Sequence, residues 1–241
     1  GYGPGMDDGV GPGAGDGNFI DWAHAGGGGH GGAGGAGLGY AGGGSYGDPK
    51  APIMLGSAGG ATYAGGNYGN RFTGGSGGGA IHVVVSGALQ VNGRISADGQ
   101  SAGGGVIVTT PYGAGAGAGG SLWIQAGSLS GSGVISANGG FGQFGSPETG
   151  YDRGAGGGGG RIAFDVPNFT FSGTVSALGG LGYHKGGNGS ITGMPFPRRS
   201  MRSASAYGDL GVCSTCEFVQ TVGGPINTLT GVVDFSAIDL S

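Results

Sequence analysis

Charged residues are scarce in this sequence. Only 9% of the 241 residues are Asp, Glu, Lys or Arg, the formal net charge is −4, and Lys50 and Lys185 are the only lysines. Proteins that bind nucleic acid or an anionic membrane carry a basic patch. Long apolar runs are missing too, since none approaches the roughly 20 residues of a membrane-spanning helix. The sequence therefore predicts no nucleic-acid partner and no membrane insertion.

Helical patterns and cysteines are equally sparse. Glycine interrupts every stretch that would otherwise repeat apolar residues at the i, i+3, i+4, i+7 spacing of a helix. The only cysteines, Cys213 and Cys216, form a C-x-x-C motif, for which we expect a local disulfide and therefore an extracellular location. A reduced pair, a redox pair and half of a zinc site are the alternatives. The four histidines lack ligand spacing, so we expect neither a metal nor a cofactor.

Glycine is what the sequence has in excess. The chain contains 71 Gly and 10 Pro, and Gly does not recur at every third position as collagen requires. Such a share often indicates disorder, but 37% hydrophobic residues and little charge argue against it. Ordering glycine costs more backbone entropy than ordering any other residue. We therefore expect dense backbone hydrogen bonding, in stacked sheets or in polyglycine-II-like strands.

A repeat of about 40 residues organises positions 74–190. Three segments align, Ala80–Gly99, Ser121–Gly139 and Arg161–Gly179, with a slip of one residue in their first halves. Apolar residues alternate with polar or small ones, which predicts a half-buried strand, and a second short strand follows a glycine corner. Equivalent residues should form core ladders: Leu89, Leu129 and Phe169 in one, and Ile95, Ile135 and Val175 in the other.

The fixed period predicts an all-β fold, a short parallel β-solenoid or right-handed β-helix with long Gly-rich loops. Polyglycine-II-like packing is an option for those loops. We expect three regions: a Gly-rich N-terminal segment (1–73), the solenoid repeats (74–190), and a C-terminal tail (191–241) with strand-like patches and the cysteine motif. A start at Gly1, without Met or an apolar leader, fits a piece of a longer precursor.

Two of the repeat units resemble the glycine-rich parallel β-helix repeats of large secreted and surface-anchored proteins. The matching residues are 119–128 (GGSLWIQAGS) with 134–140 (VISANGG), and 158–166 (GGGRIAFDV) with 174–180 (TVSALGG). The resemblance covers roughly 110 residues. It implies a scaffold, an adhesin or a filament component, and a repeat that carries no catalytic residues.

Several motifs suggest chemistry. Asp7, Asp8, Asp16 and Asp21 lie in a Gly-rich setting, where calcium is one hypothesis and solvated turn carboxylates the other. Glu148 and Asp152 could mimic a glycosidase acid pair, but no second group of acids accompanies them. The basic run at 198–202 is typical of a solvated loop or of a site for an acidic partner. Asn168 and Asn188 begin glycosylation sequons. G-x-G-x-x-G matches carry no weight at this glycine content.

These features predict a non-enzymatic structural subunit of an extracellular filament, sheath or surface appendage. Its partners would be further copies of itself or neighbouring surface proteins, joined at the solenoid ends and by donation of the C-terminal strand 231–240. The alternative is a receptor- or glycan-binding adhesin. Its contact surface would be the aromatic-bearing loops, around Phe141, Phe144, Tyr151, Tyr183 and His184.

Overall fold

The computed structural model describes residues 1–4, 7–17, 24–64, 70–103, 113–143 and 154–194. Gly1–Pro197 form one compact unit and Arg198–Ser241 a second, and the described residues all belong to the first. These residues form strands and extended segments without any helix. Accordingly, the described part of the chain holds no apolar helix of membrane-spanning length.

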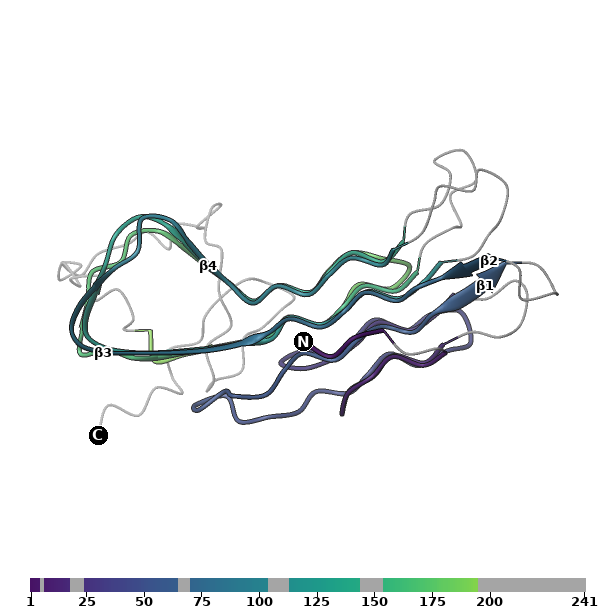
Figure 1. Ribbon diagram of the computed structural model, residues 1–241, viewed down its shortest axis with the longest axis horizontal. Helices are drawn as coiled ribbons and strands as arrows, with labels where there is room; N and C mark the ends of the chain where they lie inside the picture. Colours follow the sequence, from purple (N-terminus) through teal and green to yellow (C-terminus); the bar gives the residue numbers. More distant parts are fainter. Residues whose placement is uncertain (5–6, 18–23, 65–69, 104–112, 144–153, 195–241) are drawn as a thin grey trace, which may run out of the picture. The chain divides into compact units, whose positions relative to one another are not determined.

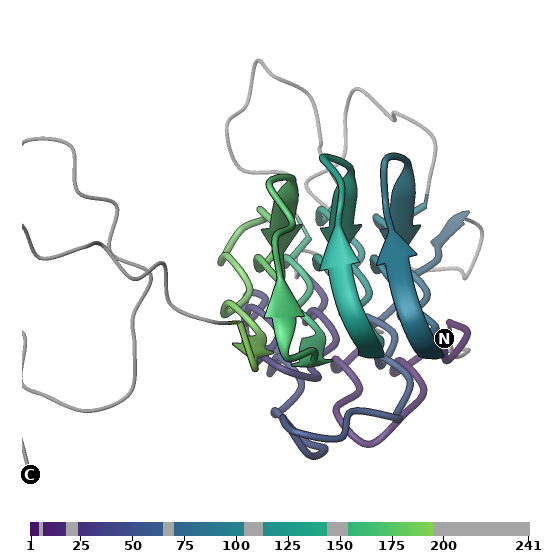
Figure 2. The same ribbon diagram turned by 90° about the vertical axis from the view of Figure 1, so that its left-hand side faces the viewer.

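Parallel strands form two sheets. The larger sheet has the order β10-β7-β5-β3, with β8 also paired to β5; its strands are β3 (Ala80–Gln90), β5 (Ser121–Ser130), β7 (Arg161–Asp165), β8 (Asn168–Phe169) and β10 (Ser190–Thr192). The smaller sheet has the order β4-β6-β9, from β4 (Arg94–Ser96), β6 (Val134–Ser136) and β9 (Thr174–Ser176). Figure 2 shows β3, β5 and β7 side by side. A separate antiparallel pair joins β1 (Thr62–Ala64) and β2 (Asn70–Phe72).

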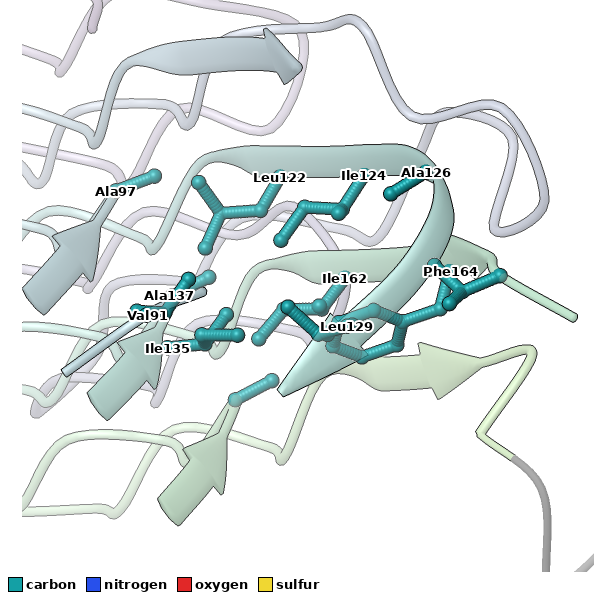
Figure 3. Close-up of a cluster of buried hydrophobic side chains, with 12 residues drawn as sticks. Val91, Ala97, Leu122, Ile124, Ala126, Leu129, Ile135, Ala137, Ile162 and Phe164 are labelled. Atoms are coloured by element: carbon teal, nitrogen blue, oxygen red, sulfur yellow. The ribbon is translucent and has the colours of Figure 1, made fainter. Parts of the chain in front are cut away.

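The apolar residues of the two parallel sheets meet in one core (Figure 3). In the larger sheet Leu89 pairs with Leu129, and Leu129 pairs with Phe169. In the smaller sheet Ile135 lies between Ile95 and Val175. Stacking like residues in register in this way buries the middle strand of each sheet most deeply, because it has neighbours on both sides.

A β-bulge explains the one-residue slip between the repeats. Val85 pairs with Ala126, but Ala88 pairs with Ser128, so the register shifts between these two rows. Two residues of β3 therefore oppose Gly127 alone, as in a bulged ladder. On the other side of β5, Pro167 separates β7 from β8. Proline has no N–H group to donate to a ladder, which accounts for the interruption there.

The Gly-rich stretches form a bundle of extended segments. Within residues 115–120 the N–H groups point to three different neighbours, and each direction recurs at every third residue. Gly115 and Ala118 donate to the 57–60 segment, Ala116 and Gly119 to 155–158, and Gly117 and Gly120 to 97–100. Three residues per turn is the geometry of an extended polyproline-II-type helix rather than of a strand.

The carbonyl groups of the same stretch face three further neighbours. Residues 113–118 accept hydrogen bonds from the segments 25–28, 75–78 and 140–143. Each partner is again reached at every third residue. One Gly-rich segment thus bonds with six others, two of them from the first 61 residues of the chain. Figure 1 shows these extended segments running in layers away from β3 and β4.

The prediction of a short parallel β-solenoid is therefore wrong, although the described residues are all-β. In a solenoid each repeat contacts only the repeats before and after it. Here the strands occupy only part of each 40-residue unit, and the strand order does not describe successive closed turns. The Gly-rich stretches, for which long loops and polyglycine-II-like packing were both considered, are hydrogen-bonded segments, and N-terminal segments lie among them. Glycine permits this arrangement because such close backbone contacts leave no room for side chains.

Candidate functional site: the open edge of the larger sheet

β3 is the edge strand of the larger sheet. It is 11 residues long, against three in β10 at the opposite edge. Among its side chains, Val84 is 69% and Ile81 36% exposed. Natural proteins usually protect an edge strand with Lys, with Pro or by keeping it short. β3 is long and has neither Lys nor Pro, and its bulge lies beyond Val85. Among the described residues no strand pairs with its outer edge, so the stretch before the bulge is available for pairing with another strand.

The core rows are incompletely covered at this edge. Ile81 pairs with Leu122 and Leu122 with Ile162, so the three form one row. Leu122 and Ile162 are fully buried, whereas Ile81 is 36% exposed. The other ladder shows the same difference, because Leu129 is fully buried and Leu89 only partly. One further strand next to β3 would complete the burial of these apolar residues.

The backbone of β3 offers hydrogen-bonding groups on the same side. The carbonyl of Gly79 accepts from Ser121 N–H at 2.9 Å, so Gly79 faces β5. Residues along a strand direct their backbone groups alternately to opposite edges. Ala80, His82 and Val84 therefore direct theirs to the open edge. Together with the exposed apolar row, these groups form a surface suited to β-strand addition.

Beside this edge, Asp98 lies in a polar network along the smaller sheet. Its carboxylate accepts from Asn138 N–H at 2.6 Å, from the hydroxyls of Ser96 and Ser136 at 2.7 and 3.0 Å, and pairs with Arg94. Partial burial opposes ionisation, but the hydrogen bonds outweigh it and lower the pKa of Asp98. Because every one of these partners belongs to the sheet or its corner, the network stabilises the repeats rather than providing reactive groups.

Two of the Asp residues considered for the calcium hypothesis bond within the fold. Asp8 accepts from Gly17 N–H at 2.7 Å, and Asp16 accepts from Ala41 N–H at 3.2 Å. Asp21 lies outside the described residues. No group of three or more His, Cys, Asp or Glu positioned to hold a metal occurs within the described part of the chain.

Several other predicted sites lie outside the described residues: the Cys213–Cys216 pair, the Glu148 and Asp152 acids, the basic run at 198–202, and the strand at 231–240. The two sequon asparagines are described, and both are exposed. Asn168 donates to the carbonyl of Gly127 at 3.2 Å, and Asn188 accepts from Gly179 N–H at 3.1 Å. Glycosylation at either position stays a prediction.

The expected adhesin surface is only partly described, because Phe144 and Tyr151 fall outside the described residues. Phe141 is 48% and Tyr183 40% exposed. The Tyr183 ring lies 5.1 Å from that of His24 and 4.7 Å from that of His184. These aromatic residues are at the surface, and the rings of Tyr183, His24 and His184 pack against one another.

The outward face of the larger sheet carries a group comprising His82, Trp123, Gln125 and Asp165, of which sequence reasoning placed only Asp165 outward. Strand alternation also indicates the orientation of Trp123, because Leu122 and Ile124 point into the core and the residue between them must point out.

No family model, curated protein or solved structure matches this chain.

Proposed function

We propose that this protein is a structural subunit of an extracellular filament, sheath or surface appendage. Its copies would join in series through the edges of the parallel sheets. The observation that carries this proposal is the open edge of β3, where unpaired backbone groups accompany a half-exposed core row. The expected disulfide and the resemblance to surface-protein repeats support an extracellular location.

The parallel sense of every strand pair in the two core sheets favours addition in series. A further parallel strand next to β3 would come from the opposite edge of another copy, where β10 and β9 lie. Such a contact joins two different surfaces, and repeating it gives an open chain rather than a closed dimer. A two-fold contact of β3 with itself would be antiparallel and would stop at two copies.

The first experiment is electron microscopy and sedimentation velocity of the intact protein at physiological salt. We expect filaments or a ladder of species that grows with protein concentration. A concentration-independent monomer would overturn the proposal, and a species that stops at the dimer would replace series addition by the two-fold contact.

The edge itself can be tested with Val84→Pro. Proline removes the N–H group that faces the open edge and is tolerated on edge strands whose N–H faces solvent. We expect this variant to fold but to sediment as a monomer at concentrations where the wild type polymerises. Val84→Thr is the matched control, since it keeps the N–H group and the β-branched shape. Polymers of unchanged size from Val84→Pro would show that β3 is not the joining surface.

A second function, the binding of a glycan, is favoured by a different observation. The outward face of the larger sheet presents an exposed aromatic and polar group that the proposed assembly does not use.

A further inference from the structure

Four side chains form a continuous strip on the outward face of the larger sheet: His82 on β3, Trp123 and Gln125 on β5, and Asp165 on β7. We call them the outward strip. In the sheet register His82 pairs with Trp123, and Gln125 pairs with Asp165. His82 and Asp165 are exposed, and the two β5 residues are half-buried.

The aromatic part of the outward strip is ordered by stacking. The rings of His82 and Trp123 lie 4.2 Å apart at an interplanar angle of 8°. Because the two residues are paired across neighbouring strands, this stacking holds the indole upright on the sheet. Trp123 is thus a rigid, partly exposed apolar surface, and such residues dominate the energetics of many binding sites.

The polar part is a hydrogen-bond relay across three strands. Gln125 Nε2 donates to Asp165 Oδ2 at 3.1 Å, and Gln125 Oε1 lies 2.8 Å from His82 Nε2. Since Gln125 Oε1 can only accept, His82 Nε2 must carry the proton. The relay leaves further acceptor sites at His82 Nδ1, in the neutral ring, and at the second oxygen of Asp165.

This relay adds little to stability. His82 and Asp165 are exposed and Gln125 is half-buried, so water competes for each hydrogen bond, and polar pairs in such positions typically contribute less than about 1 kcal/mol. Ordering the three side chains also costs rotamer entropy. The relay fixes the directions of donors and acceptors beside Trp123. Such preorganisation lowers the entropic cost of binding a ligand.

Among the described residues, one segment covers the adjoining part of this face. The 46–54 segment crosses it, where its carbonyls at Met54 and Pro49 accept from Ser121 and Thr192 at 2.6 and 2.8 Å. The outward strip begins in the row of the sheet that contains Thr192 and continues into the next outward-facing row. The outward strip therefore lies beside this segment and brings an indole and hydroxyl-binding groups together.

We propose that the outward strip binds a neutral polysaccharide, one sugar ring packing against Trp123 and its hydroxyls bonding to Gln125, Asp165 and His82. Its one carboxylate, Asp165, and the absence of Lys and Arg from its four members disfavour uronate and sulfated glycans by like-charge repulsion. A flat apolar ring edged with oriented polar groups is the usual composition of a small-ligand site. The proposal does not depend on polymerisation.

The test measures binding of the intact protein to insoluble cellulose and chitin, followed by calorimetry with soluble cello- and chito-oligosaccharides. Alginate and heparin serve as the anionic contrast. We expect binding to at least one neutral glycan, and a loss of affinity of about tenfold or more for Trp123→Ala. Leu38→Ala is the matched control, since it removes a 48% exposed apolar side chain that belongs neither to the outward strip nor to the aromatic-bearing loops, and it should leave affinity unchanged.

Gln125→Ala tests the relay with Trp123 in place and should weaken binding severalfold. It also keeps the proposal testable if Trp123→Ala does not fold, which circular dichroism and the unfolding midpoint will show. Binding to none of the neutral glycans, binding to anionic glycans alone, or equal affinity in wild type and Gln125→Ala would each overturn the proposal. None of these outcomes bears on the sedimentation test of polymerisation.

Discussion

Individual glycines in the bundle are required because they have no side chain. A Cβ atom built on Gly117 would lie 2.0 Å from the carbonyl oxygen of Ser76, which is a backbone atom of a neighbouring segment. Gly117 is not one of the glycines with a positive φ angle. Its requirement is therefore close approach of two chains rather than an unusual backbone conformation.

This requirement predicts that Gly117→Ala lowers the free energy of unfolding by about 1–3 kcal/mol, because neighbouring backbone must shift to admit a methyl group. Gly44→Ala is the matched control. Nothing lies within 4 Å of a Cβ atom built on Gly44, so we expect no loss, or a gain of up to about 1 kcal/mol from reduced unfolded-state entropy. Urea unfolding monitored by circular dichroism measures both, and equal effects would contradict the bundle as described.

At this scale the sequence reveals little. Gly44 ends a GGG run and Gly117 alternates with alanines in GAGAGAGG, and both runs read as flexible loop. Only the hydrogen-bonded neighbours distinguish them, since Gly117 bonds with Gln100 and Gly140. Those partners come from segments that carry no side-chain pattern pointing to one another.

At the scale of elements, the ladders concentrate apolar burial on the middle strands. Leu129 in β5 is fully buried between Leu89 and Phe169, whereas Leu89 is covered on one side only. The energetic contribution of a leucine should therefore depend on its place in the row rather than on its place in the repeat.

We expect Leu129→Ala to cost about 2–5 kcal/mol of unfolding free energy, as for other fully buried leucines. Leu89→Ala should cost clearly less in the isolated subunit. If copies pair at β3, the cost of Leu89→Ala should rise toward that of Leu129→Ala in the polymer, because the partner then covers Leu89. Unfolding of the monomeric Val84→Pro background and of the wild-type polymer compares the two states, and equal costs for both leucines in the monomer would contradict the exposed row.

Elements with side-chain patterns could be predicted from the sequence, and the others could not. The 40-residue spacing that relates Leu89 to Leu129 is also the register of the sheet, because apolar residues must share a face to be buried. The segments between strands were expected as loops of a solenoid because glycine carries no such pattern. Their partners, including residues 25–28 and 57–60, follow from backbone hydrogen bonding alone.

At the scale of the whole described unit, His30 lies where the glycine bundle, the larger sheet and the 46–57 segment meet. Its side chain is fully buried, and its Nδ1 lies 3.0 Å from the carbonyl of Gly119. Its ring is 4.8 Å from that of Tyr46. The backbone carbonyl of Tyr46 accepts from Arg161 Nε at 2.8 Å, and the Tyr46 hydroxyl bonds to the hydroxyl of Ser57 at 2.8 Å. Protonation of His30 would therefore disturb all three parts together.

Burial lowers the pKa of His30 below 6.5, the hydrogen bond to Gly119 partly opposes this, and the Arg161 guanidinium lowers it further. The charged groups facing the site are Arg161 and, beside Arg161, Asp48. A proton on His30 Nε2 would have no hydrogen-bond acceptor among the described residues. Because the unfolded chain binds this proton more readily than the folded one, stability is complete above pH 6.5 and falls as the pH drops from there toward the folded pKa.

We therefore predict that the unfolding free energy of the unit decreases from pH 7.5 to pH 5.5, by at most about 1.4 kcal/mol per pH unit for one group. His30→Gln removes the titrating group while keeping a donor for Gly119, so its stability should be lower overall but flatter with pH over this range. His184→Gln, at an exposed histidine, is the matched control for loss of an imidazole. If the unfolding free energy of His30→Gln depends on pH as steeply as that of the wild type, the acid-sensitive group is another residue. If the pH dependence of the unfolding free energy is lost in His30→Gln and kept in His184→Gln, His30 is the acid-sensitive contact between the glycine bundle and the larger sheet.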